Sequence, residues 1–225
     1  MNWNTVLQFA RGPFFAAALL IFIAGMIYRL ISVILLGFTR DKVPPAGSKG
    51  LGVLKSYLKG ILAWPFIPWV KQTFTGNPVM FLAGGLFHLS LFTVTLFGTA
   101  HVLVWKSLLG FAFPSLPLPI VDFMAAVGII AMVALLILRF THPVLKKITG
   151  VPEILNWAFV FVPMVTGYIT THHLFFRYEV LFSIHMLAID ALLIYIPFSR
   201  IAHFMFYFFA RTIHGTEFGK RAVNP

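Results

Sequence analysis

The chain contains no cysteine among its 225 residues. This absence excludes disulfide bonds, covalently attached c-type haem, and any iron–sulfur cluster held by this chain alone. Acidic residues are also few, with 6 Asp and Glu against 17 Lys and Arg. A redox centre in this chain would therefore have to rest on its 8 histidines.

Charge is scarce as well. Charged residues make up 10% of the chain, hydrophobic residues make up 60%, and the mean hydropathy is +0.92. These values exclude a soluble globular domain and predict a polytopic membrane protein. A net charge of +11 would favour nucleic acid as a partner of a soluble protein, but here the basic residues gather in particular loops, as orientation in a membrane requires. The expected partner is membrane lipid and not nucleic acid.

Five apolar segments are long enough to cross a bilayer. The sequence therefore predicts an all-α bundle of five transmembrane helices in a single membrane domain, without an internal repeat. Most basic residues follow the first, third and fifth segments, so the N-terminus is expected outside and the C-terminus in the cytoplasm. The five segments are residues 13–38, 78–105, 120–140, 154–171 and 178–209.

The longest stretch between spans, residues 39–77, is strongly basic. It carries six Lys and Arg residues and one acid, Asp41. Within it, residues 51–64 alternate apolar residues with lysine at roughly helical spacing, which is typical of an amphipathic helix lying on an anionic cytoplasmic leaflet. A docking surface for a cytoplasmic partner is the alternative.

Four histidines fall within two of the predicted spans, where ionisable groups are rare and usually functional. Eighteen residues separate His185 from His203, so in one continuous helix both rings would leave the same face about 27 Å apart. The second and fifth spans run antiparallel. His88 is therefore expected to pair with His203 on the cytoplasmic side, and His101 with His185 on the outer side. Two such pairs predict two bis-histidine haem sites.

Small residues precede the histidines of the second span. Gly84 and Gly85 lie about one turn before His88, and Gly98 lies three residues before His101. A porphyrin lying against a helix needs a missing side chain at this spacing. Close packing of helices through small residues is the alternative for each glycine.

The angular spacing on the second span fits less well. Thirteen residues at about 100° each leave His88 and His101 about 140° apart around one helix. A helix tilt, a bulge or an off-centre macrocycle would absorb this difference. His172 and His173, also near the outer face, compete with His101 for the outer iron; otherwise they form a hydrated turn.

Other polar residues have two interpretations each. Arg29, in the first span, either snorkels to the interface or pairs with a haem propionate. Asp190, in the fifth span, either serves a proton or quinone pathway or bonds a neighbouring helix. Asp122 is expected at the interface, and His142 and His214 are expected at the surface.

Several short motifs accompany the five spans: Gly25-Met26-Ile27-Tyr28-Arg29, Leu86-Phe87-His88, Thr166-Gly167, and His185 followed by Pro197-Phe198-Ser199-Arg200 and His203. In this combination the chain resembles the gamma-subunit family of respiratory nitrate reductase over nearly its whole length. In its size and lack of cysteine it is most similar to the small cytochrome b subunits of the high-molecular-weight, multihaem cytochrome c complexes of sulfate-reducing bacteria.

The resemblance implies two b-type haems and exchange of electrons with menaquinone near the outer haem. It also implies a multi-subunit respiratory complex in the bacterial inner membrane, with a cytoplasmic iron–sulfur protein, other membrane subunits, and in some members a periplasmic multihaem cytochrome c. In the nitrate reductase pattern the second histidine follows the first by ten residues, a position that Gly98 holds here. The implied axial ligands are His88, His203, His101 and His185.

Two other functions remain open from the sequence. The first alternative to an electron-transfer subunit is a structural or anchoring subunit with one or no haem. A small proton-coupled carrier, with the intramembrane histidines and Asp190 as its relay, is the third reading. The absence of an inverted repeat and of helix pairs broken by Gly or Pro disfavours the carrier.

Overall fold

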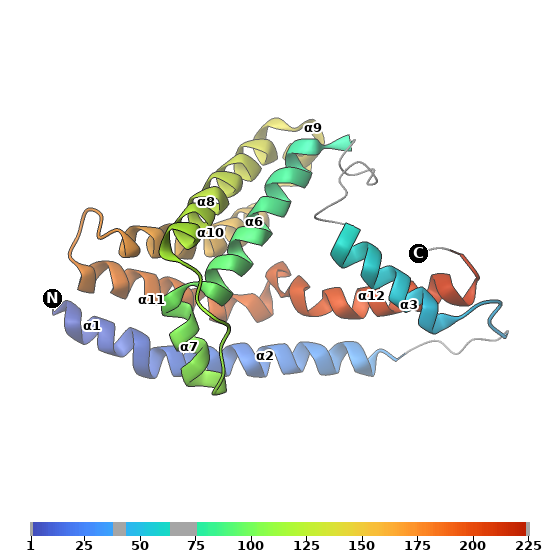
Figure 1. Ribbon diagram of the computed structural model, residues 1–225, viewed down its shortest axis with the longest axis horizontal. Coiled ribbons are helices and arrows are strands. Elements are labelled where there is room, and N and C mark those ends of the chain that lie inside the picture. The colour runs from blue at the N-terminus through green and yellow to red at the C-terminus, as the bar shows by residue number, and fades with distance from the viewer. Residues whose placement is uncertain (1, 38–43, 64–75, 224–225) are drawn as a thin grey trace. The chain divides into compact units, whose positions relative to one another are not determined.

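The computed structural model describes residues 2–37, 44–63 and 76–223, and Figure 1 shows a chain built of helices. These described residues form no strand. Five of their helical segments are long and apolar enough to cross a membrane, which confirms the predicted all-α class and a multi-pass membrane protein in contact with lipid. The segments are Trp3–Leu35, Pro78–Phe97, Leu118–Thr141, Val151–Thr171 and Tyr178–Phe198.

The chain divides into two compact units. The first joins Met1–Leu19 to Asn77–Leu193, and the second joins Leu20–Gly76 to Ile194–Pro225. The first contains α1 (Trp3–Phe9), η1 (Ala10–Phe14), α6 (Pro78–Phe97), α7 (Thr99–Leu109), α8 (Leu118–Thr141), α9 (Pro143–Ile148), α10 (Val151–Thr171) and most of α11 (Tyr178–Tyr195). The second contains most of α2 (Phe15–Leu35), α3 (Lys49–Tyr57), η2 (Leu58–Ala63), η4 (Ile196–Phe198), η5 (Arg200–Ala202) and α12 (His203–Lys220).

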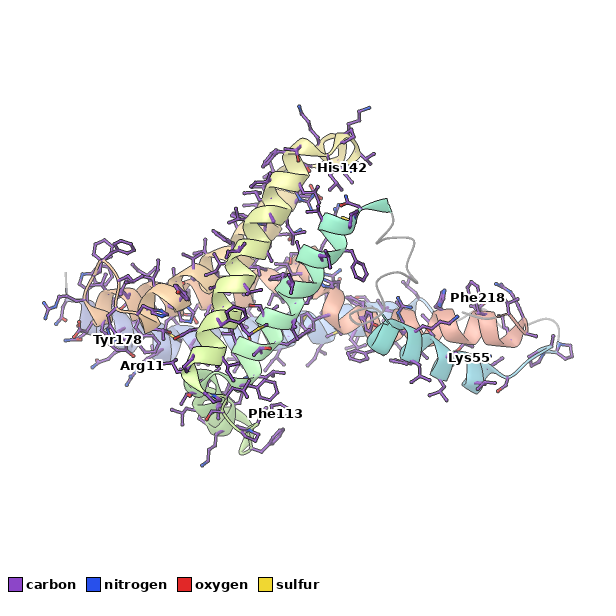
Figure 2. All side chains as sticks on the ribbon, turned by 45° about the horizontal axis from the view of Figure 1, so that its top comes forward. Arg11, Lys55, Phe113, His142, Tyr178 and Phe218 are labelled. Carbon is purple, nitrogen blue, oxygen red and sulfur yellow. The ribbon has the colours of Figure 1, made fainter. Side chains whose placement is uncertain are left out.

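In the first unit, α6 lies beside α8 (Figures 1 and 2) because small residues let the two helices approach closely. The Ser90 hydroxyl donates a hydrogen bond to the Met124 carbonyl (2.5 Å). A Cβ on Gly128 would lie 2.1 Å from that hydroxyl oxygen, so no side chain fits there. The Trp157 indole N–H donates to the Met132 carbonyl (2.8 Å) and ties α10 to α8.

The first helix begins ten residues before the predicted span. The Asn2 side chain caps α1 by accepting a hydrogen bond from the Asn4 backbone N–H (3.1 Å). The helix then continues through the π-helical turn η1, which contains Pro13, into α2. The Ser183 hydroxyl oxygen of α11 lies 3.4 Å from the Trp3 carbonyl oxygen, so the start of this helix lies beside α11.

The second predicted span, residues 78–105, is not one continuous helix. α6 ends at Phe97, Gly98 takes an extended backbone conformation (φ −66°, ψ 132°), and α7 begins at Thr99. The expectation of a single helix carrying both His88 and His101 is therefore wrong. The break also removes the predicted angular conflict, because α7 does not continue the helical register of α6.

Backbone carbonyls freed at this break find new donors. A helix break in a lipid-facing segment needs such replacement bonds because lipid supplies none. The Trp105 indole N–H donates to the Thr95 carbonyl (2.7 Å), and the Leu116 backbone N–H donates to the Phe97 carbonyl (2.9 Å).

The fifth predicted span, residues 178–209, is also interrupted. After α11 the chain makes the two 3₁₀ turns η4 and η5, and α12 begins at His203. Pro197 supplies no backbone N–H to continue the helix, and Ser199 between the turns is extended (φ −123°, ψ 175°). The prediction that His185 and His203 leave one face of a single helix is therefore wrong, because the turns do not preserve the helical register.

In the second unit, α2 packs against this interruption. A Cβ on Gly25 would lie 2.5 Å from the Pro197 Cβ, so only glycine allows this approach. One turn later the Arg29 guanidinium donates to the carbonyls of Pro197 (3.0 Å) and Ser199 (2.8 Å) and lies 5.1 Å from the centre of the Phe206 ring. Arg29 thus satisfies carbonyls at the interrupted helix, and its pairing with a haem propionate stays a prediction.

Arg29→Gln is expected to destabilise this unit, because hydrogen bonds to a charged group contribute about 1.5–3 kcal/mol each. The thermal unfolding midpoint of the purified protein should fall clearly, and Arg29→Lys should recover only part of the loss because an ammonium lacks the planar fork. Arg11→Gln, at an exposed position, is the control. Equal midpoints for Arg29→Gln and Arg11→Gln would contradict this role.

Glycines also bring α3 against α12. A Cβ on Gly52 would lie 2.2 Å from the Gly215 carbonyl oxygen, and a Cβ on Gly215 would lie 2.5 Å from the Val53 Cα. The Tyr57 hydroxyl of α3 also donates a hydrogen bond to the Phe208 carbonyl of α12 (2.9 Å). Two backbones therefore meet here without intervening side chains.

The outer face of α3 partly matches the predicted amphipathic segment. Leu51, Leu54 and Leu58 are 52%, 55% and 47% exposed at helical spacing, and this apolar stripe adjoins the lysines of the same stretch. Residues 39–43 and 64–75 of the predicted basic stretch lie outside the described part of the chain. That the stripe rests on the membrane surface stays a prediction.

Candidate functional site

His101 and His185 come together inside the first unit. Their ring centres are 6.4 Å apart, with the ring planes inclined at 55°. His101 is held on α7 just after the break at Gly98, and His185 lies in the middle of α11. The outer histidine pair expected from the antiparallel spans is thus a pair of neighbours in the fold.

Each ring of this pair uses its Nδ1 atom for a hydrogen bond. His101 Nδ1 is 2.9 Å from the Val94 carbonyl, which can only accept, so Nδ1 carries the hydrogen. His185 Nδ1 is 3.2 Å from the Thr166 hydroxyl. That hydroxyl already donates to the Val162 carbonyl (2.8 Å), so it accepts from His185. Both imidazoles therefore present an unprotonated Nε2, the form that ligates a metal.

The separation of the two rings fits one metal ion held between them. An imidazole nitrogen lies about 2.0–2.1 Å from a metal and the ring centre roughly 1.2 Å beyond it, so two opposed ligands place their ring centres about 6.5 Å apart. The observed 6.4 Å agrees. Within the described ranges no three His, Cys, Asp or Glu residues cluster as a metal site, whereas a haem iron needs only two axial ligands from the protein.

Two glycines shape the space around the pair. A Cβ on Gly167 would lie 3.0 Å from His185 Cε1, so glycine at this position lets α10 approach the ring closely. A Cβ on Gly98 would lie 3.2 Å from His101 Nδ1 and 2.6 Å from the Val94 oxygen. Gly98 therefore interrupts the helix and leaves room for the His101 ring. The prediction that Gly98 and His101 lie about one turn apart on a continuous helix is wrong.

The competing histidines are engaged elsewhere. His172 Nε2 lies 3.5 Å from Asp122 Oδ2, and its ring centre is 4.3 Å from that of Tyr168. His173 takes a positive φ of 52° in the turn and packs on Tyr178, with ring centres 5.4 Å apart. Neither is paired with His185 as His101 is, so the geometry favours His101 as the outer ligand.

His88 has a similar local arrangement on α6. Its Nδ1 is 2.7 Å from the Gly84 carbonyl, which can only accept, so Nδ1 carries the hydrogen. Cβ atoms built on Gly84 and Gly85 would meet nothing within 4 Å, which leaves open space beside both. That a porphyrin lies against these glycines stays a prediction. His203, the first residue of α12, has its Nδ1 3.1 Å from the Arg200 carbonyl.

His88 belongs to the first unit and His203 to the second. Their predicted pairing around a second haem stays a prediction.

The two remaining histidines have surface roles. His142 Nδ1 accepts hydrogen bonds from the backbone N–H groups of Val144 (3.3 Å) and Leu145 (3.4 Å), so it caps α9 where that short helix follows α8 (Figure 2). His214 is exposed on α12. Both agree with the expectation from sequence.

Asp190 is fully buried in α11, and neither carboxylate oxygen has a hydrogen-bond partner among the described residues. One of the two expected roles of Asp190, a hydrogen bond to a neighbouring helix, is therefore not observed among the described residues. A role in a proton or quinone pathway stays a prediction.

Sequence reasoning missed the partners that orient the ligand rings. The Val94 carbonyl and the Thr166 hydroxyl hold the rings. The Thr166-Gly167 pair was visible as a motif without a role. A backbone carbonyl such as that of Val94 leaves no signal in a sequence.

Comparisons with known proteins add a distant relative. A protein of Nitratidesulfovibrio vulgaris (strain Hildenborough), whose name states no activity, is 26% identical over 211 residues, which cover 93% of this chain and 92% of the relative. No family model matches the chain, and no solved structure matches it.

Proposed function

We propose that this chain is a membrane cytochrome b subunit that relays electrons across the bilayer through two b haems. The observation that carries the proposal is the His101–His185 pair, with rings at the spacing of two axial ligands and both Nδ1 atoms engaged. The resemblance to the gamma-subunit family of nitrate reductase supports the same function. His88 and His203 are the proposed ligands of the second haem.

A bound haem would supply one-electron redox chemistry through its iron. The chain's own residues would fix the two imidazoles: the Val94 carbonyl and the Thr166 hydroxyl hold the ring orientation and increase the ligand basicity of Nε2. Gly98 and Gly167 leave room for the rings. The surrounding apolar helices exclude water and lower the local dielectric, which tunes the reduction potential.

The proposed setting is the bacterial inner membrane, with the N-terminus outside. Menaquinone is the proposed electron partner near the His101–His185 haem. A cytoplasmic iron–sulfur protein, other membrane subunits and a periplasmic multihaem cytochrome c are the proposed protein partners. The chain would act as an electron-transfer subunit and not as an enzyme by itself.

A haem count tests this proposal. The purified complex should give a b-type band in its reduced-minus-oxidised spectrum and two haems per chain by the pyridine haemochrome method. One haem or none per chain would favour an anchoring subunit. Complete absence of a b-type band would favour the proton-coupled carrier, for which the unpartnered Asp190 is the candidate relay group.

Gly167→Val is expected to weaken the haem held by His185. Any Cβ at this position lies 3.0 Å from the ring, so the imidazole has to move away from its ligating position. The haem count should fall from two toward one, and Gly12→Val, where a Cβ meets nothing within 4 Å, should leave it unchanged. An unaltered count and spectrum in Gly167→Val would contradict the proposed site.

A further inference from the structure

Asp190 is an acidic residue enclosed within a span. It lies in α11, inside the apolar segment Tyr178–Phe198, and its relative exposure is 0%. Neither carboxylate oxygen has a hydrogen-bond partner among the residues that the structure describes. An ionised carboxylate in such a place loses its hydration and needs a compensating positive charge, whereas a neutral carboxyl group costs much less to bury. Whether Asp190 holds a proton therefore depends on the positive charge around it.

The described residues of the first unit supply no basic side chain that bonds to Asp190. The basic residues of this unit are Arg11, Lys106, Arg139, Lys146, Lys147 and Arg177. Arg139 donates a hydrogen bond to the Thr149 hydroxyl (3.5 Å), and the other five are exposed. The unit's six histidines and three other acids also form no hydrogen bond with Asp190 in the part of the chain that the structure describes. A charge on Asp190 would therefore have to be balanced by something other than a side chain of this unit.

Asp190 lies near the proposed haem site on the same helix. It follows His185 by five residues, about 7.5 Å along the helix axis, and its oxygens are not hydrogen-bonded to the His185 or His101 ring. A b-type haem between two neutral imidazoles carries one net positive charge at its centre when the iron is ferric and none when it is ferrous. Water screens buried charges only weakly. The oxidised centre would therefore stabilise a carboxylate at Asp190, and this stabilisation would be lost on reduction.

We propose that Asp190 is a redox-linked proton-binding site, an inference that rests on the proposed haem function. One electron from a one-electron carrier reduces the ferric iron held by His101 and His185 to ferrous iron. One O–H bond forms on the Asp190 carboxylate with a proton that comes from water. Oxidation reverses both changes. The net charge inside the span stays constant, which avoids the cost of adding an uncompensated charge to a medium of low dielectric constant.

Redox titrations of the purified complex at several pH values near neutrality test the inference. The haem concerned is the component that His185→Gln lacks. Its midpoint potential should fall as the pH rises, with a slope approaching about 59 mV for each tenfold change in proton concentration, the limit for one proton per electron. Asp190→Asn keeps the size of the side chain but cannot ionise. This variant should keep both haems and lose most of the slope.

Glu179→Gln is the matched control. Glu179 precedes His185 by six residues on the same helix, but its side chain is 39% exposed, so water screens its charge and the wild-type slope should remain. A wild-type slope in Asp190→Asn would overturn the inference, and so would a wild-type potential that does not change with pH.

Infrared spectroscopy gives a second readout, which decides the matter if Asp190→Asn binds no haem. The reduced-minus-oxidised difference spectrum of the wild-type protein should contain a carboxyl C=O band that appears on reduction and shifts in heavy water. In Asp190→Glu, which keeps the carboxyl group, this band should move to a different frequency. A missing band, or one that does not move in Asp190→Glu, would overturn the inference. Absence of any b-type spectrum in the wild-type protein would instead overturn the proposed function.

Discussion

Replacement of His185 by glutamine removes one of the two proposed haems and leaves the other. Glutamine keeps a hydrogen-bonding group next to Thr166 but does not supply the imidazole nitrogen that iron prefers. His101 alone cannot complete the bis-histidine site. The pyridine haemochrome count should fall from two to one per chain, with loss of one component of the b-type band.

The pairing itself is tested by combining variants. If His101 and His185 share one iron, the double variant loses no more haem than either single variant, whereas His185→Gln combined with His88→Gln loses both haems. His214→Gln, at an exposed position on α12, should keep two. Additive loss in the His101/His185 double variant would show that these residues hold different haems, and the site described above would then be wrong.

Gly215→Ala should strongly destabilise the contact between α3 and α12. The new Cβ would lie 2.5 Å from the Val53 Cα and 2.7 Å from the Gly52 carbonyl oxygen. Because these are backbone atoms, no side-chain rotation relieves the overlap and the helices must separate. Overpacking of this kind costs about 1–3 kcal/mol. We expect a lower thermal unfolding midpoint and faster proteolysis of the segment that contains α3.

A matched control lies on α3, the partner helix of α12. Gly50 is exposed on α3 and a Cβ there meets nothing within 4 Å, so Gly50→Ala should be neutral or slightly stabilising through its higher helix propensity. Gly52→Ala should resemble Gly215→Ala, since its Cβ would meet the Gly215 carbonyl oxygen. If all three variants unfold at the same temperature, the close approach of the two backbones is not important for stability.

The five spans could be predicted from sequence because their signal is simple: long apolar runs and the distribution of basic residues between them. The interruptions could not. Glycine and proline occur inside many continuous transmembrane helices, so Gly98 and Pro197 gave no clear sign that the helices stop there. The close packing of α3 on α12 did leave a signal, since Gly215 and Gly219 are spaced four residues apart as small residues at helix contacts commonly are.

The pairing of His101 with His185 could be predicted from sequence, but the atoms that orient their rings could not. Antiparallel spans bring His101 and His185 to the same depth, which needs only topology. The atoms that orient the rings are a backbone carbonyl at Val94 and a hydroxyl at Thr166 on a third helix. Sequence reasoning does not reveal that α10 approaches this pair. The same holds for Arg29, whose partners are the carbonyls of Pro197 and Ser199.

The interruption at Gly98 has a consequence for how such proteins evolve. In an unbroken helix, one inserted or deleted residue between His88 and His101 would turn one ring away by about 100°. Because α7 is a separate helix that begins after Gly98, an insertion or deletion at Gly98 need not rotate either ring around its own helix. Homologues are therefore expected to differ in the interval between these two histidines, and a search pattern that demands a fixed interval would overlook them.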